Sequence, residues 1–309
     1  MTRRQTTSHI LMIRPGAFGF NPETADSNAF QSNETDLTRE EIQQRALREF
    51  DTMVEKLRAH GITVQVHQDD PSVPKPDAVF PNNWFTTHAT GAIVTYPLMG
   101  ASRRAERVEA VLDRLNETYK VSEIFRLEEA EQEERYLEGT GSIIMDRRNR
   151  IAYACISPRT HELTFHAFCK RYDLEPVSFT SVGSDGTPVY HTNVMMSVGN
   201  DFVVICLDSI PKRSERDRLL KIFKRTEKEV VEISLEQMNQ FAGNMLQVHN
   251  REGVPYLVLS QAAYDSLTTE QIEQLSARTE LLPVAIPTIE KFGGGSARCM
   301  MAEIFLPKK

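Results

Sequence analysis

The sequence has few cysteines, and their arrangement excludes the usual structural uses of this residue. Four occur in 309 residues, and no two of them form a Cys-x-x-Cys pair. A zinc site or a redox-active dithiol of the usual spacing is therefore not expected. In a chain of this length we interpret all four as free thiols in a reducing compartment. They are Cys155, Cys169, Cys206 and Cys299.

The sequence also lacks a long apolar run and an excess of positive charge. No segment approaches the roughly 20 apolar residues of a membrane span, and none precedes the first predicted strand. The formal net charge is −7, whereas a nucleic-acid-binding domain is usually basic. We therefore expect a cytoplasmic protein with neither a nucleic-acid nor a membrane partner. The charged pair Arg103-Arg104 is expected on a solvated helix face, and a homodimer stays open.

The sequence does contain a repeated order of predicted elements. A strand, a turn, a second strand, a helix and a third strand recur, for example over 142–179 and 194–233. The copies begin with a large apolar residue, two further residues and a small polar one, and Cys299 takes the polar place in the last copy. The polar positions lie 51 to 57 residues apart, which is typical of a repeat architecture. They are Asn83, Thr140, Asn193, Asn244 and Cys299.

Five such positions imply five ββαβ modules, the last of them divided between the two ends of the chain. A strand over 299–306 would start it, and the strand over 10–14 is left without a hairpin partner. Pairing these two strands would close a ring and remove its open edges. We therefore predict an α/β fold, a five-bladed pseudo-symmetric propeller forming one domain over residues 1–309. Its pocket would be lined by the five strand starts.

Elements outside the repeat are predicted from local signals. Thr38-Arg-Glu-Glu41 is a capping-box pattern, which predicts a helix ending near Gly61. A further helix is expected from about 102 to 119. Residues 17–33 show no clear period and predict a long loop, a kind of segment that often carries function.

Three residues of different chemistry are expected at the mouth of the ring. Cys299 follows the glycines at 293–295, which allow the backbone to approach a ligand closely. Nearby basic groups can make such a thiol reactive. His191 lies two positions before Asn193, and Glu138 lies two before Thr140. The repeat thus brings a candidate nucleophile, a candidate proton shuttle and a carboxylate to one pocket.

An ordered set of motifs resembles a known superfamily. Asp77-Ala-Val-Phe, Leu137-Glu-Gly-Thr-Gly, Tyr190-His-Thr-Asn and Gly293-Gly-Gly-Ser-Ala-Arg-Cys occur in this order, with the cysteine near the C-terminus. Together they resemble the guanidine-modifying superfamily, which includes arginine deiminase, dimethylarginine dimethylaminohydrolase and the amidinotransferases. The finer pattern around Phe80-Pro-Asn-Asn-Trp-Phe is most similar to the citrulline-utilization hydrolase type of arginine-deiminase-related proteins.

The resemblance implies a hydrolase that acts on a C–N bond of an arginine-like guanidine, with no metal or cofactor. Cys299 would attack the guanidinium carbon, and ammonia or an alkylamine would leave. Water would then release a ureido product from the covalent thiouronium. His191 would serve as acid and base, and Glu138 would bind the guanidinium. Further substrate-binding candidates are Asp77, Asn82, Asn83, Asn244, Arg298 and Arg14.

One position departs from the superfamily pattern. Relatives carry a carboxylate where this chain has Asn83, and an amide cannot pair with the charge of a guanidinium. The departure points away from an ordinary arginine deiminase, toward a modified guanidine, another end product, or a substrate charge that Glu138 alone balances. Arg298 and Arg14 are candidates for a substrate carboxylate because of their forked donors, with a structural role as the alternative. An amidinotransferase stays open, as does a non-catalytic protein such as the ribosome-associated anti-association factor of this fold.

Overall fold

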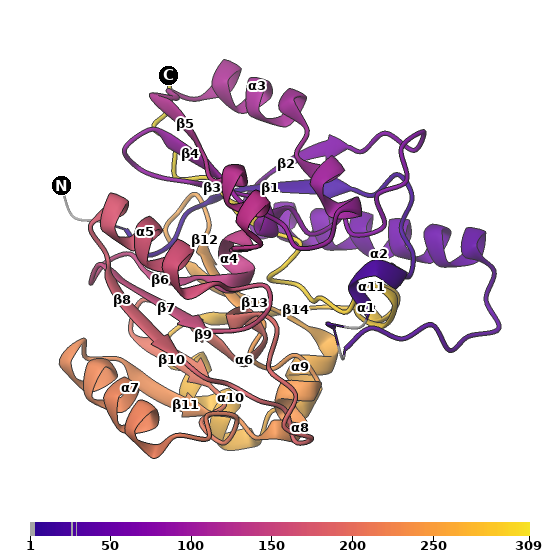
Figure 1. The fold of residues 1–309 in the computed structure, drawn as a ribbon. Coiled ribbons are helices and arrows are strands. Elements are labelled where there is room, and N and C mark those ends of the chain that lie inside the picture. Colours follow the sequence, from indigo (N-terminus) through magenta and orange to yellow (C-terminus); the bar gives the residue numbers. More distant parts are fainter. Residues whose placement is uncertain (1–3, 26, 29) are drawn as a thin grey trace.

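The protein is described by a computed structural model over residues 4–25, 27–28 and 30–309, and the strands of these ranges form five three-stranded sheets. In four sheets the first two strands form an antiparallel hairpin and the third runs parallel to the second. Figure 1 shows three of them in sequence order, from β3–β5 at the top through β6–β8 to β9–β11, with β12–β14 near the middle of the view. The strands are β3 (Phe85–Thr87), β4 (Ala92–Thr95), β5 (Glu123–Arg126), β6 (Ile144–Asp146), β7 (Ile151–Cys155), β8 (Glu175–Phe179), β9 (Met196–Val198), β10 (Phe202–Ile205), β11 (Glu229–Glu232), β12 (Leu246–His249), β13 (Pro255–Ser260) and β14 (Glu280–Val284).

The fifth sheet joins the two ends of the chain, as the repeat predicted. β15 (Ala302–Glu303) pairs antiparallel with β1 (His9–Arg14), and β1 pairs parallel with β2 (Thr63–Gln68). The predicted strand over 299–306 was too long, because residues 297–300 form a hydrogen-bonded turn and only two residues pair as a strand. The five-module α/β propeller is confirmed.

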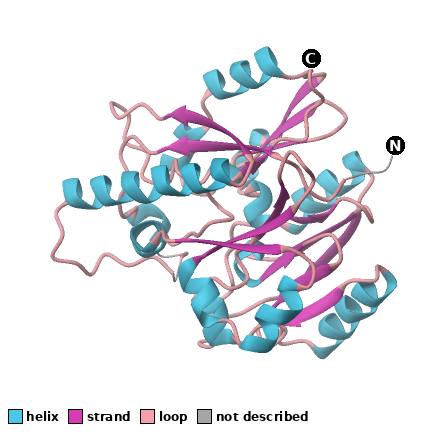
Figure 2. Ribbon diagram, turned by 180° about the vertical axis from the view of Figure 1, so that it is seen from behind, coloured by secondary structure: helices cyan, strands magenta, loops and turns pink. Residues whose placement is uncertain are grey.

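Helices lie outside the sheets, as Figure 2 shows. The capping box predicted at Thr38 is present, and its helix α2 runs over Arg39–Ala59. The helix expected over 102–119 is interrupted, because the chain is extended at Arg107 and Val108. The helical elements are η2 (Ser102–Glu106), α3 (Glu109–Thr118), η3 (Glu128–Glu133), α5 (Glu162–Tyr172), α7 (Arg213–Arg225), α8 (Leu235–Asn239), α9 (Gln261–Ser266), α10 (Thr269–Ser276), α11 (Pro287–Gly293) and the single turn α1 (Pro22–Ala25).

The polar repeat positions lie on turns that precede the strands, three of them helical, whereas we predicted them at the strand starts. The turns are η1 (Pro81–Asn83), α4 (Gly139–Ser142) and α6 (Thr192–Met195), with non-helical turns at 241–244 and 297–300. Neighbouring turns pack closely: a Cβ on Gly139 would lie 2.2 Å from the carbonyl oxygen of Asn82. Gly139 also has a φ of +48°, so both sterics and conformation explain the glycine after Glu138.

Each sheet contributes to apolar clusters that hold these turns in place. The largest cluster packs strands of the β6–β8, β9–β11 and β12–β14 sheets together, and Phe202 and Tyr153 are fully buried within it. Trp84 and Phe85 are buried beside η1 in another cluster. Within the described ranges, no helix is both long enough and apolar enough to cross a membrane.

Candidate active site

The turns surround a small polar pocket at the inner ends of the modules. Its cavity volume is about 10 Å³, room for about one water molecule. The side chains of the lining residues therefore nearly fill the pocket. The lining residues are Thr24, Asn28, Asp77, Phe80, Asn83, Arg103, Arg159, Tyr190, His191, Gly293, Gly294, Gly295 and Cys299.

The thiol of Cys299 is held between two side-chain amides. The Nδ2 atoms of Asn193 and Asn244 each donate to Sγ at 3.3 Å. Sγ also lies 3.7 Å from Asn244 Oδ1. The Asn244 amide can therefore accept a hydrogen bond from Cys299 as a thiol through Oδ1 and donate one to Cys299 as a thiolate through Nδ2. Asn244 Oδ1 accepts from the backbone N–H of Arg298 at 3.1 Å, which fixes its orientation. Donors aimed at the sulfur stabilise negative charge there.

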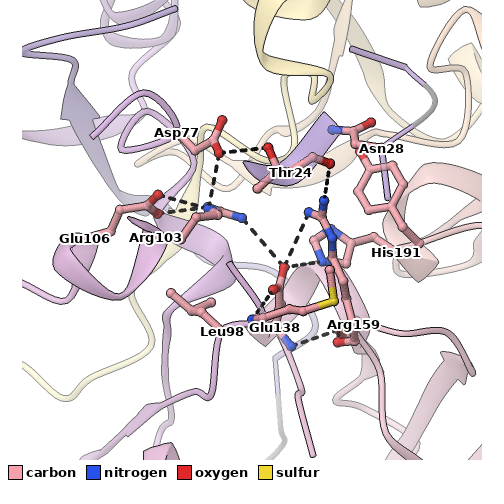
Figure 3. Close-up of polar contacts among 12 residues, drawn as sticks. Thr24, Asn28, Asp77, Leu98, Arg103, Glu106, Glu138, Arg159 and His191 are labelled. Atoms are coloured by element: carbon pink, nitrogen blue, oxygen red, sulfur yellow. Dashed lines mark hydrogen bonds and ion pairs between the residues drawn. The ribbon is translucent and has the colours of Figure 1, made fainter. Parts of the chain in front are cut away.

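His191 and Glu138 form a buried hydrogen-bonded pair. His191 Nε2 lies 2.8 Å from Glu138 Oε2. Figure 3 shows Glu138 in contact with His191 and with two arginines, Arg103 and Arg159. Burial lowers the pKa of His191 to about 4, although Glu138 acts in the opposite direction. Burial by itself would raise the pKa of Glu138, but Arg159, His191 and Arg103 bring it to about 2. Near neutral pH the pair is therefore a neutral imidazole and a carboxylate.

Two buried arginines complete the charge arrangement, and the sequence analysis assigned neither to the site. Arg103 lies on η2, donates twice to Glu106 at 2.9 Å, and lies 3.6 Å from both Asp77 and Glu138. Arg159 Nη1 lies 3.7 Å from Glu138, and its Nη2 donates to the Thr24 carbonyl at 3.0 Å. The expected solvated helix face at Arg103 was wrong, because this side chain is 2% exposed. Its buried carboxylate partners explain why it turns inward.

Asp77 and Asn83 lie on the pocket wall, and Asn82 lies behind it. Asp77 Oδ2 accepts from Asn21 at 2.8 Å, whereas its buried Oδ1 has no hydrogen-bond partner among the described residues. In the amide orientation that satisfies its neighbours, Asn83 accepts from Arg103 Nη1 at 3.0 Å and donates to Asn82 Oδ1 at 3.1 Å. Asn82 is fully buried and does not line the pocket, so its expected contact with a substrate stays a prediction.

The structure places Arg14 and Arg298 away from the pocket, which corrects both assignments. Arg14 ends β1 and forms a 2.8 Å ion pair with Asp51 of α2. Arg298 Nη1 donates to the Met301 carbonyl at 3.0 Å, and Nη2 lies 3.1 Å from Glu303. Each guanidinium is used by a local partner, and the turn at 297–300 directs only Cys299 toward the pocket.

Described residues of the segment predicted as a long loop over 17–33 lie at the pocket. Thr24 and Asn28 line it, and Asn28 Nδ2 donates to the Gly294 carbonyl at 3.2 Å. Gly294 has a φ of +61°, and a Cβ there would lie 2.4 Å from Asn28 Nδ2. The glycine run before Cys299 therefore allows this segment to approach. No repeat or motif signal pointed to Thr24 or Asn28.

Comparison with solved structures shows that this chain shares its fold with known proteins. The apo structure of ArgZ, an arginine dihydrolase of the ornithine-ammonia cycle in cyanobacteria, matches with a TM-score of 0.75 and 15% identity over 97% of this chain and 41% of ArgZ. Unliganded AgrE matches with a TM-score of 0.74 and 16% identity, over 97% of this chain and 40% of AgrE. The chain thus spans less than half the length of either protein.

A dimethylarginine dimethylaminohydrolase, solved as an adduct with 4-chloro-2-hydroxymethylpyridine, matches with a TM-score of 0.66 and 16% identity. The match covers 96% of this chain and 99% of that one. No curated protein sequence matches significantly. Residues 14–306 match the family described as N,N dimethylarginine dimethylhydrolase, eukaryotic. Because this match spans nearly the whole sequence, the chain belongs to that family, within the guanidine-modifying superfamily that the motifs predicted.

Proposed function

We propose that this protein is a cysteine-dependent hydrolase that cleaves a C–N bond of an arginine-like guanidine. The observation that carries the proposal is the pocket lined by Cys299 and His191, with Glu138 buried behind His191 as its hydrogen-bond partner and two amide donors on the sulfur. A nucleophile and a base that is itself oriented by a third group is the arrangement that covalent catalysis requires. The relatives named above include an arginine dihydrolase and a dimethylarginine dimethylaminohydrolase, which act on compounds of this class.

The charges of the pocket fit an amino acid that carries a guanidinium group. Glu138 and the free Oδ1 of Asp77 are acceptors for guanidinium N–H donors. Arg103 and Arg159 are donors for a carboxylate at the other end of the substrate. In the structure Arg103 satisfies the acids itself, at 3.6 Å from Asp77 and from Glu138. Substrate binding would exchange this internal pairing for pairing with the substrate, so little net charge is left unpaired in either state.

The protonation states support a direct sequence of proton transfers. Neutral His191 would take the Cys299 proton as Sγ attacks the guanidinium carbon, and the charge of Glu138 would stabilise the imidazolium. His191 would pass this proton to the departing nitrogen, and ammonia or an alkylamine would leave a thiouronium on Sγ. Water would give a proton to His191 and attack the same carbon. The C–S bond would break, His191 would return the proton to sulfur, and a ureido compound would leave.

A second hydrolysis is the alternative that Asn83 favours. A ureido product is neutral, so a pocket with an amide in place of a carboxylate discriminates less strongly against it. If Cys299 attacked this product too, each substrate would yield two ammonia molecules, carbon dioxide and a free amine. The name arginine dihydrolase, carried by ArgZ, describes such a double reaction. Counting ammonia per substrate consumed separates one step from two.

The experiment is a screen of arginine, methylated arginines, acylated arginine and agmatine for ammonia, ureido product and amine. Cys299→Ser is the control, and intact-protein mass should show an adduct on the wild-type chain alone. We expect turnover of a substrate that has both a guanidinium and a carboxylate, and loss of turnover in Cys299→Ser. Unchanged turnover in Cys299→Ser would overturn the proposal. Release of product only with an acceptor amine would indicate an amidinotransferase, and no turnover at all a non-catalytic protein.

A further inference from the structure

A second and much larger cavity lies at the opposite end of the modules from the candidate active site. β3 (Phe85–Thr87) lies between Asn83, which lines the candidate active site, and His88, which lines this second cavity of about 700 Å³. Cavities that hold small molecules are usually of this size. Among the described residues, the two cavities have no lining residue in common. The lining residues are at positions 4, 6–9, 88–90, 119, 145, 147, 172, 174, 249, 304–306 and 308.

The charge of this cavity is opposite to the charge of the protein. Arg4, Arg147 and Lys308 line it together with three histidines, and no aspartate or glutamate is among the described lining residues. The chain as a whole has a net charge of −7. Like charges at close range repel one another, so such a concentration in one concave space is unfavourable unless an anion enters it.

Arg147 is the residue that points most directly to a ligand. Its guanidinium lies 4.0 Å from the centroid of the Phe305 ring and has no ion-pair or hydrogen-bond partner among the described residues, whereas its backbone N–H donates to Gln5 Oε1. The nearby carboxylate of Glu303 is paired with Arg298 at 3.1 Å. Burial lowers the pKa of Arg147 from its ordinary value. A forked donor held by an aromatic ring without an acceptor is ready for a bidentate anion.

The histidines of the cavity experience the same positive field. Burial lowers the pKa of His9, and Lys308, Arg251 and His249 lower it further. Burial lowers the pKa of His249 as well, with a further effect of Arg4. His88 stacks on Tyr172 with ring centroids 4.4 Å apart, so the wall also offers flat aromatic surface.

We propose that this cavity binds a small phosphate-bearing anion, with Arg147 as its central contact and Arg4 and Lys308 at its rim. Phosphate oxygens match the forked donors of arginine and neutralise several cations at once. Inorganic polyphosphates and nucleotides share this chemistry, and the stacked His88 and Tyr172 offer a surface for a nucleotide base. The site is independent of the proposed hydrolase activity.

Calorimetric titration of the full chain with pyrophosphate tests the proposal, with chloride used to hold ionic strength constant. A parallel titration with ATP compares the two sources of phosphate. The variants are Arg147→Gln inside the cavity and Lys308→Gln on an exposed position at its rim. Arg213→Gln is the matched control, because this side chain is 94% exposed on α7.

We expect saturable binding by the wild type and by Arg213→Gln, and affinity at least about tenfold weaker in Arg147→Gln. Lys308→Gln should bind more weakly than wild type, and it keeps the test valid if Arg147→Gln does not fold. Tighter binding of ATP than of pyrophosphate would assign a nucleotide, and equal binding an inorganic phosphate. Binding that neither variant weakens, or no binding beyond that of chloride, would overturn the proposal.

Discussion

At the scale of single residues, the environment of the candidate nucleophile is set by amides. Cys299 has no basic side chain as a hydrogen-bond partner among the described residues, and its two donors are Asn193 and Asn244. A charge-assisted hydrogen bond to a buried ion contributes about 1.5–3 kcal/mol. The repeat analysis placed Asn244 in the pocket, and its contact with Sγ gives that placement a chemical use.

Replacing Asn244 by alanine removes one donor from the sulfur. We expect kcat/KM to fall roughly 10- to 100-fold, because a thiolate would lose one of its two hydrogen bonds. Alkylation of Cys299 by iodoacetamide, followed by mass spectrometry, should slow as well. Asn116→Ala, an exposed change on α3, should alter neither rate. A wild-type alkylation rate in Asn244→Ala would contradict this account of the thiol.

Arg103 is held by buried carboxylates, and this network predicts that the free energy of unfolding depends strongly on Arg103. Burial would lower the pKa of Arg103, yet Glu106, Asp77 and Glu138 together raise it. Replacing Arg103 by glutamine leaves Glu106 and Asp77 without a cation, whereas Glu138 keeps Arg159. We therefore expect a loss of roughly 3–5 kcal/mol in the free energy of unfolding. Urea denaturation measures it, and adding Glu106→Gln should restore part of the loss.

Arg104→Gln is the comparison for this experiment. The Arg104 side chain is 36% exposed and lies 3.2 Å from Glu131, and ion pairs of this kind contribute about 0–1 kcal/mol. Equal effects of the two arginine substitutions would show that the buried network does not stabilise the fold.

The sequence was sufficient to predict the position of the residues that the repeat aligns, and insufficient to predict the position of the others. Cys299, His191 and Glu138 were placed in one pocket because they hold matching positions in their modules. Arg103 and Arg159 hold no such positions, and Arg103 lies in a charged run that resembles an ordinary solvated surface. Besides the local partner Glu106 of Arg103, the carboxylates beside them, Asp77 and Glu138, lie far away in the sequence. Arg14 and Arg298 were chosen for their chemistry alone, and local acids bind them instead.

At the scale of elements, turns and caps were predicted better than lengths. The capping box at Thr38 specifies the start of α2 because both of its hydrogen bonds are local. The break between η2 and α3 falls at Arg107 and Val108, just after the turn that carries the buried Arg103, and the sequence pattern over 102–119 did not predict it. β15 has two residues because the turn that presents Cys299 uses the positions before it.

The helix α11 carries a buried glutamate beside the glycine run, and its titration predicts a pH effect. Ser296 Oγ donates to Glu290 Oε1 at 2.6 Å, and burial raises the pKa of Glu290 to about 7. The folded state therefore holds this proton more tightly than the unfolded state. Stability from Glu290 is full below pH 4.5 and is lost as the pH rises toward 7.

Glu290→Gln should remove this dependence, because glutamine stays neutral and still accepts from Ser296. We expect the variant to be more stable than wild type above pH 7, by up to roughly 3 kcal/mol, and the difference to shrink below pH 5. Denaturant unfolding at several pH values gives the difference curve, in which other titrating groups cancel. Glu273→Gln, on an exposed position of α10, should give a flat curve. A flat curve for Glu290→Gln would rule out the buried titration.

At the scale of the whole molecule, the pairing of the chain ends couples stability to the site. β15 covers one edge of β1, and Ile304 N–H donates to the His9 carbonyl at 2.9 Å. Ile304 and Leu306 are also buried in an apolar cluster. The repeat period predicted this pairing, since the count of modules left one strand at each end without a partner. The side-chain positions that close the pocket depend on all five modules, so they followed only from the folded structure.

Deleting residues 302–309 should therefore destabilise the protein severely. Two buried apolar side chains contribute about 1.5–3 kcal/mol each, and the lost strand pairing adds to this. Their sum is comparable to the total free energy of unfolding of many domains. Thermal unfolding followed by circular dichroism should therefore show a strongly lowered melting temperature or no cooperative transition. Deleting only Lys308 and Lys309, whose side chains are exposed, should leave a cooperative transition and the turnover of the guanidine substrate intact. A chain that lacks 302–309 yet melts as the wild type does would mean that the ring stays closed without its last strand.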